Sequence, residues 1–270
     1  MSNIPYPPPL SLTTLLKNIN LIDENNNKGD KFECSECKWA KNDKEVQKSA
    51  FFAKVCLHSS PLECVYMKVN SILQVGPTCG LTALSMVFNG SPNADSLLKK
   101  AIRLKYSLNG EMFSAQWLLN LLKENIEESN VLKPNKVRAY IYDGILDTEF
   151  IKEKLKMHCM ILVPYDADIR NHTPAIENGH RAHWCLVCGF LIDESKNFYI
   201  FARNGKSKNL GLFSLKDLSD SNDNLNEFQQ PTQHVNSIFL LPECGINGNN
   251  GLKRKCIIIE GLLNEVVKVV

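Results

Sequence analysis

The segment 74–84, QVGPTCGLTAL, constrains the fold of this chain more than any other stretch. The Gly-Pro pair at 76–77 cannot lie inside a helix, whereas the apolar residues after Cys79 recur at the spacing of one helical face. An Asn-Gly pair at 89–90 then ends the pattern, as is usual at helix C-termini. The segment therefore predicts a tight loop that runs into a helix, with Cys79 in its first turn. At that position, free N–H groups and the helix dipole favour a thiolate over a thiol.

The side-chain amide of Gln74 is expected to point back across the turn toward Cys79. A nucleophile and an oxyanion donor would then come from one short segment. The alternative is that Cys79 is a small buried core residue, as free cysteines often are. The segment in isolation does not decide between these two interpretations.

The composition is that of a globular protein and excludes several classes of function. The chain has 270 residues, of which 44% are hydrophobic and 22% charged, and a formal net charge of +2. This balance argues against a general nucleic-acid binder. The N-terminus carries no signal-peptide pattern, and the longest apolar run, 184–192, is too short to cross a bilayer. We therefore expect a cytoplasmic protein without a membrane anchor, with its ten cysteines reduced.

Residues 1–30 are expected to be a flexible tail, and residues 31–270 a single domain. Within the tail, Pro5–Pro9 favours a polyproline II conformation, which aromatic grooves recognise, although a simple solvated tail has the same composition. The pair Cys34 and Cys37 is half of a zinc site, but no downstream Cys or His completes a common zinc spacing. No metal or cofactor is predicted.

The first half of the chain has mainly helical patterns and the second half mainly strand patterns, which predicts an α+β architecture. Helices are expected at 43–57, from Cys79 to 89, from the Ser-Pro pair at 91–92 to about 102, after 110–114, and at 147–157. Strands are expected at 137–142, 160–165, 183–192, 198–202, 235–241 and 256–259, and a polar loop at 217–233.

His183 is the best candidate for a general base beside Cys79. It opens the apolar strand 183–192, which would hold the imidazole rigidly, and Trp184 follows it as a shield against water. His172 and His180, on the preceding loop, are more mobile alternatives. Paired with the thiol of Cys79, the imidazole would accept its proton and later protonate a leaving amine.

Asn204 is the candidate for a third residue that orients the imidazole. It lies at the end of the next strand in an antiparallel meander, where its side-chain amide is expected to accept a hydrogen bond from His183. Asp193 is the alternative, but it lies at the far end of the His183 strand, about 30 Å away at ~3.4 Å per residue. The sequence therefore favours Asn204.

Four stretches, at 74–86, 110–114, 163–184 and 205–208, resemble the actin maturation protease family in order and spacing. That family is itself similar to papain-like cysteine peptidases of the bacteriocin-processing type. The resemblance covers roughly residues 70–245, and four motifs in order are far more specific than one.

The resemblance implies a papain-like α+β fold, with the nucleophile helix in a helical N-terminal half that packs on an antiparallel C-terminal sheet. It implies that Cys79 is the nucleophile, His183 the base and Gln74 the oxyanion donor, with Asn204 at the third catalytic position. The implied activity is that of a cofactor-free thiol aminopeptidase, which removes the N-acetylated Met or Cys from newly made actin.

The acidic residues that follow in actin suit a basic region near the predicted site. The candidates for substrate binding are Arg181, Trp184, Arg203, Lys206 and Lys208. A solvated basic loop is the alternative for the charged residues. The resemblance also makes Pro5–Pro9 a candidate for binding profilin, and a monomer is expected. Two other functions remain open: a papain-like peptidase or amide hydrolase with a different substrate, and a non-catalytic scaffold that binds actin or profilin.

Overall fold

Helices pack around one antiparallel sheet in this mixed α and β fold. The computed structural model describes residues 35–128, 136–170, 172–230 and 237–270. Pro5–Pro9 and Cys34, discussed above, lie outside these residues. Residues 34–270 form one compact unit. Every helix of the described part falls short of the length and apolar character that a bilayer crossing requires.

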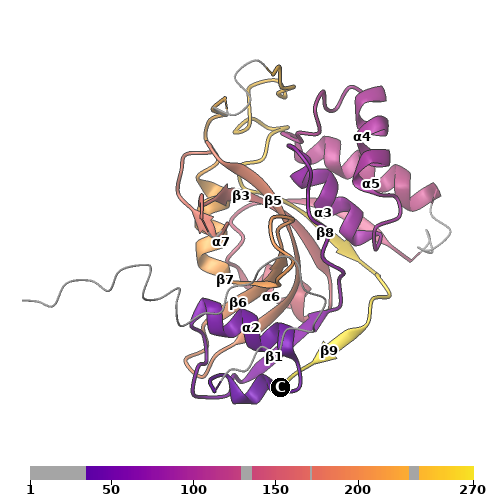
Figure 1. Cartoon of the computed structure of the whole chain (residues 1–270). Coiled ribbons are helices and arrows are strands. Elements are labelled where there is room, and N and C mark those ends of the chain that lie inside the picture. Colours follow the sequence, from indigo (N-terminus) through magenta and orange to yellow (C-terminus); the bar gives the residue numbers. More distant parts are fainter. Residues whose placement is uncertain (1–34, 129–135, 171, 231–236) are drawn as a thin grey trace, which may run out of the picture. The chain divides into compact units, whose positions relative to one another are not determined.

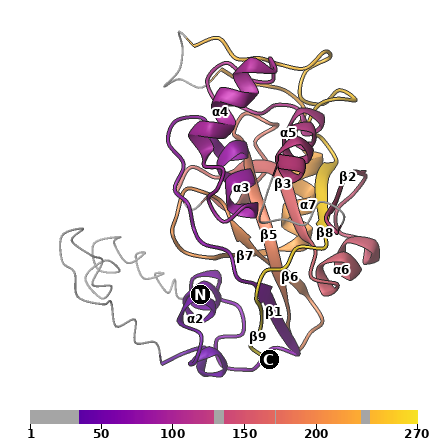
Figure 2. The same cartoon turned by 90° about the vertical axis from the view of Figure 1, so that its right-hand side faces the viewer.

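The described strands join in one sheet, whose main path runs in the order β2-β8-β3-β5-β1-β9, with β4 beside β3 and the pair β6–β7 beside β5 (Figures 1 and 2). The strands are β1 (Glu63–Met67), β2 (Arg138–Asp143), β3 (Met160–Ala167), β4 (Pro174–Ala175), β5 (Ala182–Ile192), β6 (Phe198–Arg203), β7 (Gly211–Ser214), β8 (Lys255–Glu260) and β9 (Val266–Lys268). All pairings are antiparallel.

Helices cover both faces of this sheet. They are the short 3-10 helix η1 (Lys38–Ala40), α2 (Lys44–Ala53), α3 (Cys79–Val87), α4 (Ala94–Arg103), α5 (Ala115–Glu128), α6 (Glu149–Lys156) and α7 (Leu215–Asp223). Helix α3 packs on β5 and against α4 and α5, whereas α6 contacts β5 and α7 contacts β3. Figure 2 shows the group α3–α5 on one side of the sheet and α6 and α7 on the other.

The central strands are apolar on both sides because each face meets its own layer of helices. In β5, Trp184 and Leu186 belong to the core shared with α3–α5, whereas Cys185 and Val187 belong to the core shared with α6 and α7. Since successive side chains of a strand point to opposite faces, a strand that is buried on both sides must read as a continuous apolar run.

The expectation of helices early and an antiparallel sheet later is confirmed, including the helix that begins at Cys79. Three local expectations are wrong. Helix α4 begins at Ala94 and is capped by Asn93, whose Oδ1 accepts from the Ser96 N–H, so the Ser-Pro pair at 91–92 does not start it. Residues 217–223 are not a loop but belong to α7, because Ser214 caps the helix by accepting from the Asp217 N–H and buried leucines give it an apolar face. Residues 237–241 have no regular structure, so the strand expected at 235–241 is absent from the described part of that range.

The sheet opens where β6 leaves β5, and this opening locates the candidate site. The last pair between these strands is Leu186 with Arg203, so the first residues of β5 have β3 on one side and no β6 partner on the other. Gly80, in the first turn of α3, packs against the ring of Trp184 in this part of β5. The N-terminus of a helix therefore meets the start of a central strand.

Candidate active site

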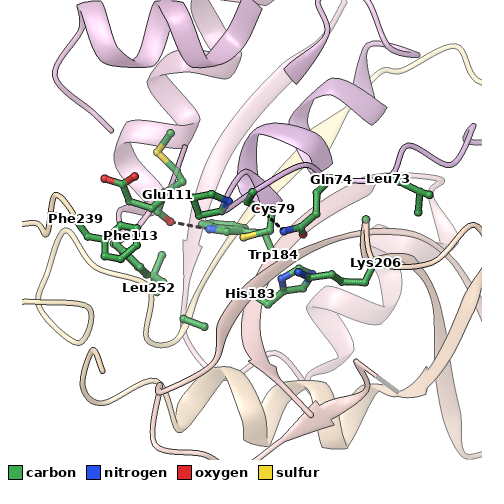
Figure 3. A pocket seen from close by; sticks show the side chains of 15 residues that line it. Leu73, Gln74, Cys79, Glu111, Phe113, His183, Trp184, Lys206, Phe239 and Leu252 are labelled. Carbon is green, nitrogen blue, oxygen red and sulfur yellow. Dashed lines mark hydrogen bonds between the residues drawn. The ribbon is translucent and has the colours of Figure 1, made fainter. Parts of the chain in front are cut away.

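A pocket of about 520 Å³ lies where the N-terminus of α3 meets the start of β5. Its lining comes from segments far apart in the sequence: 73–79, 111–113, 182–184 and 205–206, with Phe239 and Leu252. Figure 3 shows the side chains of Cys79, His183 and Gln74 directed toward one another in its middle. The fold thus brings together the three residues that the sequence singled out most strongly.

Cys79 is the first residue of α3 and is partly exposed in the pocket. Hydrogen bonds from the main chain of Trp184, Gly80 and Cys79 itself, together with the charge of Lys206, lower the pKa of the thiol. Burial has the larger effect and raises the pKa above its usual value. The helix start thus lowers the pKa of the thiol as expected, but burial outweighs this effect, so formation of a thiolate would require a base.

One main-chain hydrogen bond orients the imidazole of His183 and fixes which ring nitrogen carries the hydrogen. His183 is 6% exposed, and its Nε2 lies 2.6 Å from the carbonyl oxygen of Asn204. A carbonyl can only accept, so Nε2 carries the hydrogen and Nδ1 keeps its lone pair. Burial lowers the pKa of His183 to about 4, and nearby Lys206 acts in the same direction. At neutral pH the ring is therefore a free proton acceptor.

Asn204 contributes to the site through its main chain rather than through its side-chain amide. Its Oδ1 accepts from the N–H groups of Lys206 (2.9 Å) and Ser207 (3.3 Å), so the side chain caps its own turn. The expectation that this amide accepts from His183 is therefore corrected: the carbonyl of the same residue does so. The next carbonyl, that of Gly205, accepts from the Gln74 N–H at 2.8 Å. One turn thus holds both His183 and Gln74.

The amide of Gln74 has a fixed orientation. Its Nε2 donates to the carbonyl of Gly76 at 2.8 Å, which leaves the second N–H hydrogen of the same group unassigned. Its Oε1 is buried and lacks a hydrogen-bond partner among the described residues. Figure 3 shows this amide beside the sulfur of Cys79. The remaining hydrogen is therefore available to a negative oxygen that forms near Cys79.

The five candidates for substrate binding lie in different surroundings. Trp184 lines the pocket and donates from Nε1 to the carbonyl of Met112 at 2.8 Å. Lys206 is exposed and lines the pocket, whereas Lys208 is exposed and lines neither this pocket nor its neighbour. The prediction for Arg203 is wrong.

Arg203 is buried and its guanidinium is already occupied. It donates to both carboxylate oxygens of Glu45, at 2.6 and 2.8 Å, and to the carbonyls of Val69 and Lys208. Because these four hydrogen bonds use most of the five guanidinium N–H donors, Arg203 joins β6 to α2 instead of facing a ligand.

A second pocket of about 470 Å³ adjoins the first and shares Phe113, Ala182, His183 and Lys206 with it. Arg181 lines this second pocket, as do the two alternative histidines His172 and His180. His180 is paired with Glu227, with 2.8 Å between Nε2 and Oε1. The sequence therefore named residues of two neighbouring pockets, and of these His183 and Lys206 line both.

Sequence reasoning missed two buried carboxylates beside these pockets. Asp166 accepts from the main-chain N–H groups of Glu177, Gly179 and Arg181, and so shapes the loop that leads into β5. Glu111 is 2% exposed and lines the first pocket. Both lie in stretches that resemble the family, and that was the signal that could have found them. Among the described residues, no group of three or more His, Cys, Asp or Glu is arranged to hold a metal ion.

Comparison with known proteins gives a consistent set of relatives. A family model described as "Actin maturation protease-like, C-terminal domain" matches residues 69–191. The chain is 48% identical to the actin maturation protease of Drosophila melanogaster over 241 residues, which is 89% of this chain and 87% of the relative. It is 27% identical to that of Xenopus tropicalis over 66% of this chain and 68% of the relative. It is 32% identical to that of Homo sapiens over 45% and 34%, respectively.

The low pKa of His183 predicts how the reactivity of Cys79 depends on pH. Since the imidazole accepts the thiol proton only when neutral, alkylation of Cys79 by iodoacetamide should fall to half as the pH drops through about 4. An ordinary histidine would give this fall near 6.5. The rate is followed by mass spectrometry of the Cys79 peptide, with circular dichroism as a control for folding. A half-fall near 6.5 would contradict the assignment.

The main-chain role of Asn204 predicts a mild effect of changing its side chain. Asn204→Ala removes only the cap of the turn, a loss of about 1 kcal/mol, and should slow alkylation of Cys79 at pH 7 by less than about tenfold. Asn204→Asp, which keeps an acceptor for the same two N–H groups, should react at nearly the wild-type rate. A loss of roughly 10⁴-fold, as for the orienting side chain of a catalytic triad, would show that the amide itself holds His183.

Proposed function

Because this chain belongs to the actin maturation protease family, we propose that it is a cysteine aminopeptidase that removes the N-acetylated first residue, Met or Cys, from immature actin. The observation that carries the proposal is the arrangement of Cys79 and His183 in one pocket. The thiol lies at a helix start, and the imidazole is bonded through Nε2, which leaves Nδ1 free. Gln74 lies beside them with an N–H to spare.

The first half of the reaction forms an acyl-enzyme. Nδ1 of His183 takes the thiol proton as Sγ of Cys79 attacks the carbonyl carbon of the acetylated first residue. The carbonyl oxygen becomes negative, and the Gln74 amide and main-chain N–H groups at the start of α3 stabilise it. The carbon–nitrogen bond then breaks, and the imidazolium gives its proton to the leaving nitrogen. The shortened actin departs with a free amine, and a thioester remains on Cys79.

The second half returns the enzyme to its starting state. His183 takes a proton from water, whose oxygen attacks the thioester carbonyl. The carbon–sulfur bond breaks, and the sulfur recovers a proton from the imidazolium. The N-acetylated amino acid is released, and the pair is again thiol and neutral imidazole. No metal or cofactor takes part in either half.

An acetylated N-terminus carries no positive charge, and the pocket suits a neutral group. Glu111 contributes a carboxylate to the lining of this pocket. Its two oxygens already accept four hydrogen bonds from the protein, so it is not poised to pair with an ammonium. This arrangement fits a peptidase that takes a blocked terminus rather than a free amine.

Lys206 and Arg181 are proposed to attract the acidic residues that follow the cleaved bond. Lys206 lines both pockets, and Arg181 lines the second. Exposed charges of this kind raise the local concentration of an acidic segment and are sensitive to salt. Lys208 lies outside both pockets and is assigned no such role.

The remaining assignments follow from the family. We propose a papain-like fold for a single peptidase domain at residues 31–270, preceded by a flexible tail at 1–30. The protein would act in the cytoplasm as a monomer, where new actin is made. Pro5–Pro9 is proposed as a contact for profilin, because polyproline II segments bind aromatic grooves.

The reaction is tested with peptides that begin acetyl-Met-Asp-Asp-Asp or acetyl-Cys-Asp-Asp. Wild type should release the acetylated first residue, detected by mass spectrometry. Cys79→Ala should lose activity by a factor on the order of 10⁶, to below detection. If wild type cleaves neither these peptides nor intact immature actin, the assignment to actin is wrong. Cleavage by Cys79→Ala would refute the thiol mechanism.

The role of Lys206 is tested by a pair of matched variants. Lys206→Gln should raise the KM of acetyl-Met-Asp-Asp-Asp about 2- to 5-fold, as expected for loss of one exposed ion pair. It should change the KM of acetyl-Met-Ala-Ala-Ala much less, and added salt should reduce the difference in KM between wild type and variant for the acidic peptide. Lys208→Gln removes the same charge two residues away and should leave both peptides unchanged. Equal effects of the two variants would mean that only net charge matters.

A further inference from the structure

We propose that the segment 237–241 forms one wall of the subsite for the residue that is removed, with Phe239 and Phe113 against its side chain. This inference rests on the proposed function and deepens it by naming residues that determine specificity. The segment has no regular structure, yet Phe239 reaches the pocket that contains Cys79.

Three aromatic rings build this wall. Phe113 and Phe239 pack edge to face with ring centroids 6.2 Å apart. Phe228 contacts both rings, at 5.0 Å from Phe113 and 5.9 Å from Phe239. Phe113 and Phe239 line the first pocket, and Leu252 extends the same apolar surface. Edge-to-face packing fixes each ring, so the wall has a defined shape.

Glu111 fastens the segment in place. Its buried carboxylate accepts from the Leu240 N–H at 3.0 Å, and also from the N–H groups of Leu108 and Asn109 and the hydroxyl of Ser107. Asn109 adds a second link to the segment, since its Nδ2 donates to the carbonyl of Ile238 at 2.7 Å. Glu111 is therefore a positioning residue: it sets where the wall stands without itself reacting.

The pocket is apolar at one end and basic at the other. Figure 3 shows Phe113, Phe239 and Leu252 on one side of Cys79, and Lys206 on the opposite side. An acidic segment would leave toward Lys206. The first residue of the substrate, on the other side of the cleaved bond, must then place its side chain toward the aromatic wall.

The wall matches a sulfur-containing apolar side chain. Methionine is flexible, and its thioether makes favourable contacts with the edges of aromatic rings. A charged side chain at this end would lose its water without gaining a partner, because the carboxylate of Glu111 is already fully engaged. The subsite should therefore favour Met over a smaller residue such as Ala, since the extra atoms bury more apolar surface.

The test compares acetyl-Met-Asp-Asp-Asp with acetyl-Ala-Asp-Asp-Asp. Wild type should prefer the Met peptide in kcat/KM by roughly 10-fold or more. Phe239→Ala should reduce this preference at least about 5-fold, mainly by slowing the Met peptide. Phe239→Trp, which fills the subsite, should also shift the preference toward Ala. Ile238→Ala is the matched control, because Ile238 is the adjacent side chain, is 76% exposed and does not line the pocket.

Glu111→Gln tests whether the hydrogen bonds of Glu111 hold the segment 237–241 in position. The amide keeps one acceptor oxygen but turns an NH₂ group toward two of the four donors, so the wall should shift and the Met preference should fall as in Phe239→Ala. A variant that was merely less stable would slow both peptides equally and keep their ratio. An unchanged ratio in Phe239→Ala and Glu111→Gln, with normal cleavage, would overturn the subsite while leaving the proposed function intact.

A covalent probe distinguishes failure of the proposed subsite from failure of the proposed function. The sulfur of Cys79 displaces chloride from a chloromethyl ketone and forms a thioether with its methylene carbon, with no peptide bond cleaved. Acetyl-Met and acetyl-Ala chloromethyl ketones should inactivate wild type with a Met preference that Phe239→Ala loses. If no acetylated peptide is cleaved, the proposed function fails, and this ratio still decides the subsite. Equal inactivation of wild type by both reagents would overturn it.

Discussion

The hydrogen bond from His183 to the main chain at Asn204 is the contact on which the candidate site depends. It exists because β6 stops pairing with β5 at Arg203, so the following turn is free to fold over the start of β5. The same turn accepts the main-chain N–H of Gln74 through Gly205. A break in the sheet thus connects the proposed base, the proposed oxyanion donor and the loop before α3.

Burial shifts the pKa values of Cys79 and His183 in opposite directions. It raises the pKa of Cys79 and lowers that of His183, so each group is neutral at rest and the imidazole is ready to accept the thiol proton. The main-chain hydrogen bonds at the helix start and the charge of Lys206 lower the pKa of Cys79, but their effect is smaller than that of burial. A low-dielectric site strengthens any hydrogen bond to a charge that forms during a reaction, and for that reason a shielded pocket is useful.

The loops around the pocket are shaped by buried carboxylates that accept from the main chain rather than from cations. Asp166 organises the loop before β5, and Glu111 joins the loop before α5 to the segment 237–241. Such acceptors compensate for the lack of strand or helix pairing in these segments, since buried N–H groups must find partners. They explain how irregular segments can form walls of fixed shape around the candidate site.

The sequence by itself determined the features that depend only on neighbouring residues. The Gly-Pro turn, the helix from Cys79 and the apolar strand from His183 follow from backbone restrictions and periodicity, and so the sequence could place Cys79 at a helix start and His183 at a strand start. The long-range hydrogen-bond partners of Asn204, Arg203 and Glu111 could not be predicted from the sequence, because they lie far away along the chain. Whether a turn offers its carbonyl or its amide, and whether a guanidinium meets Glu45 or solvent, is decided by packing. The tertiary structure alone makes those choices, because sequence spacing carries no information on which distant groups are buried together.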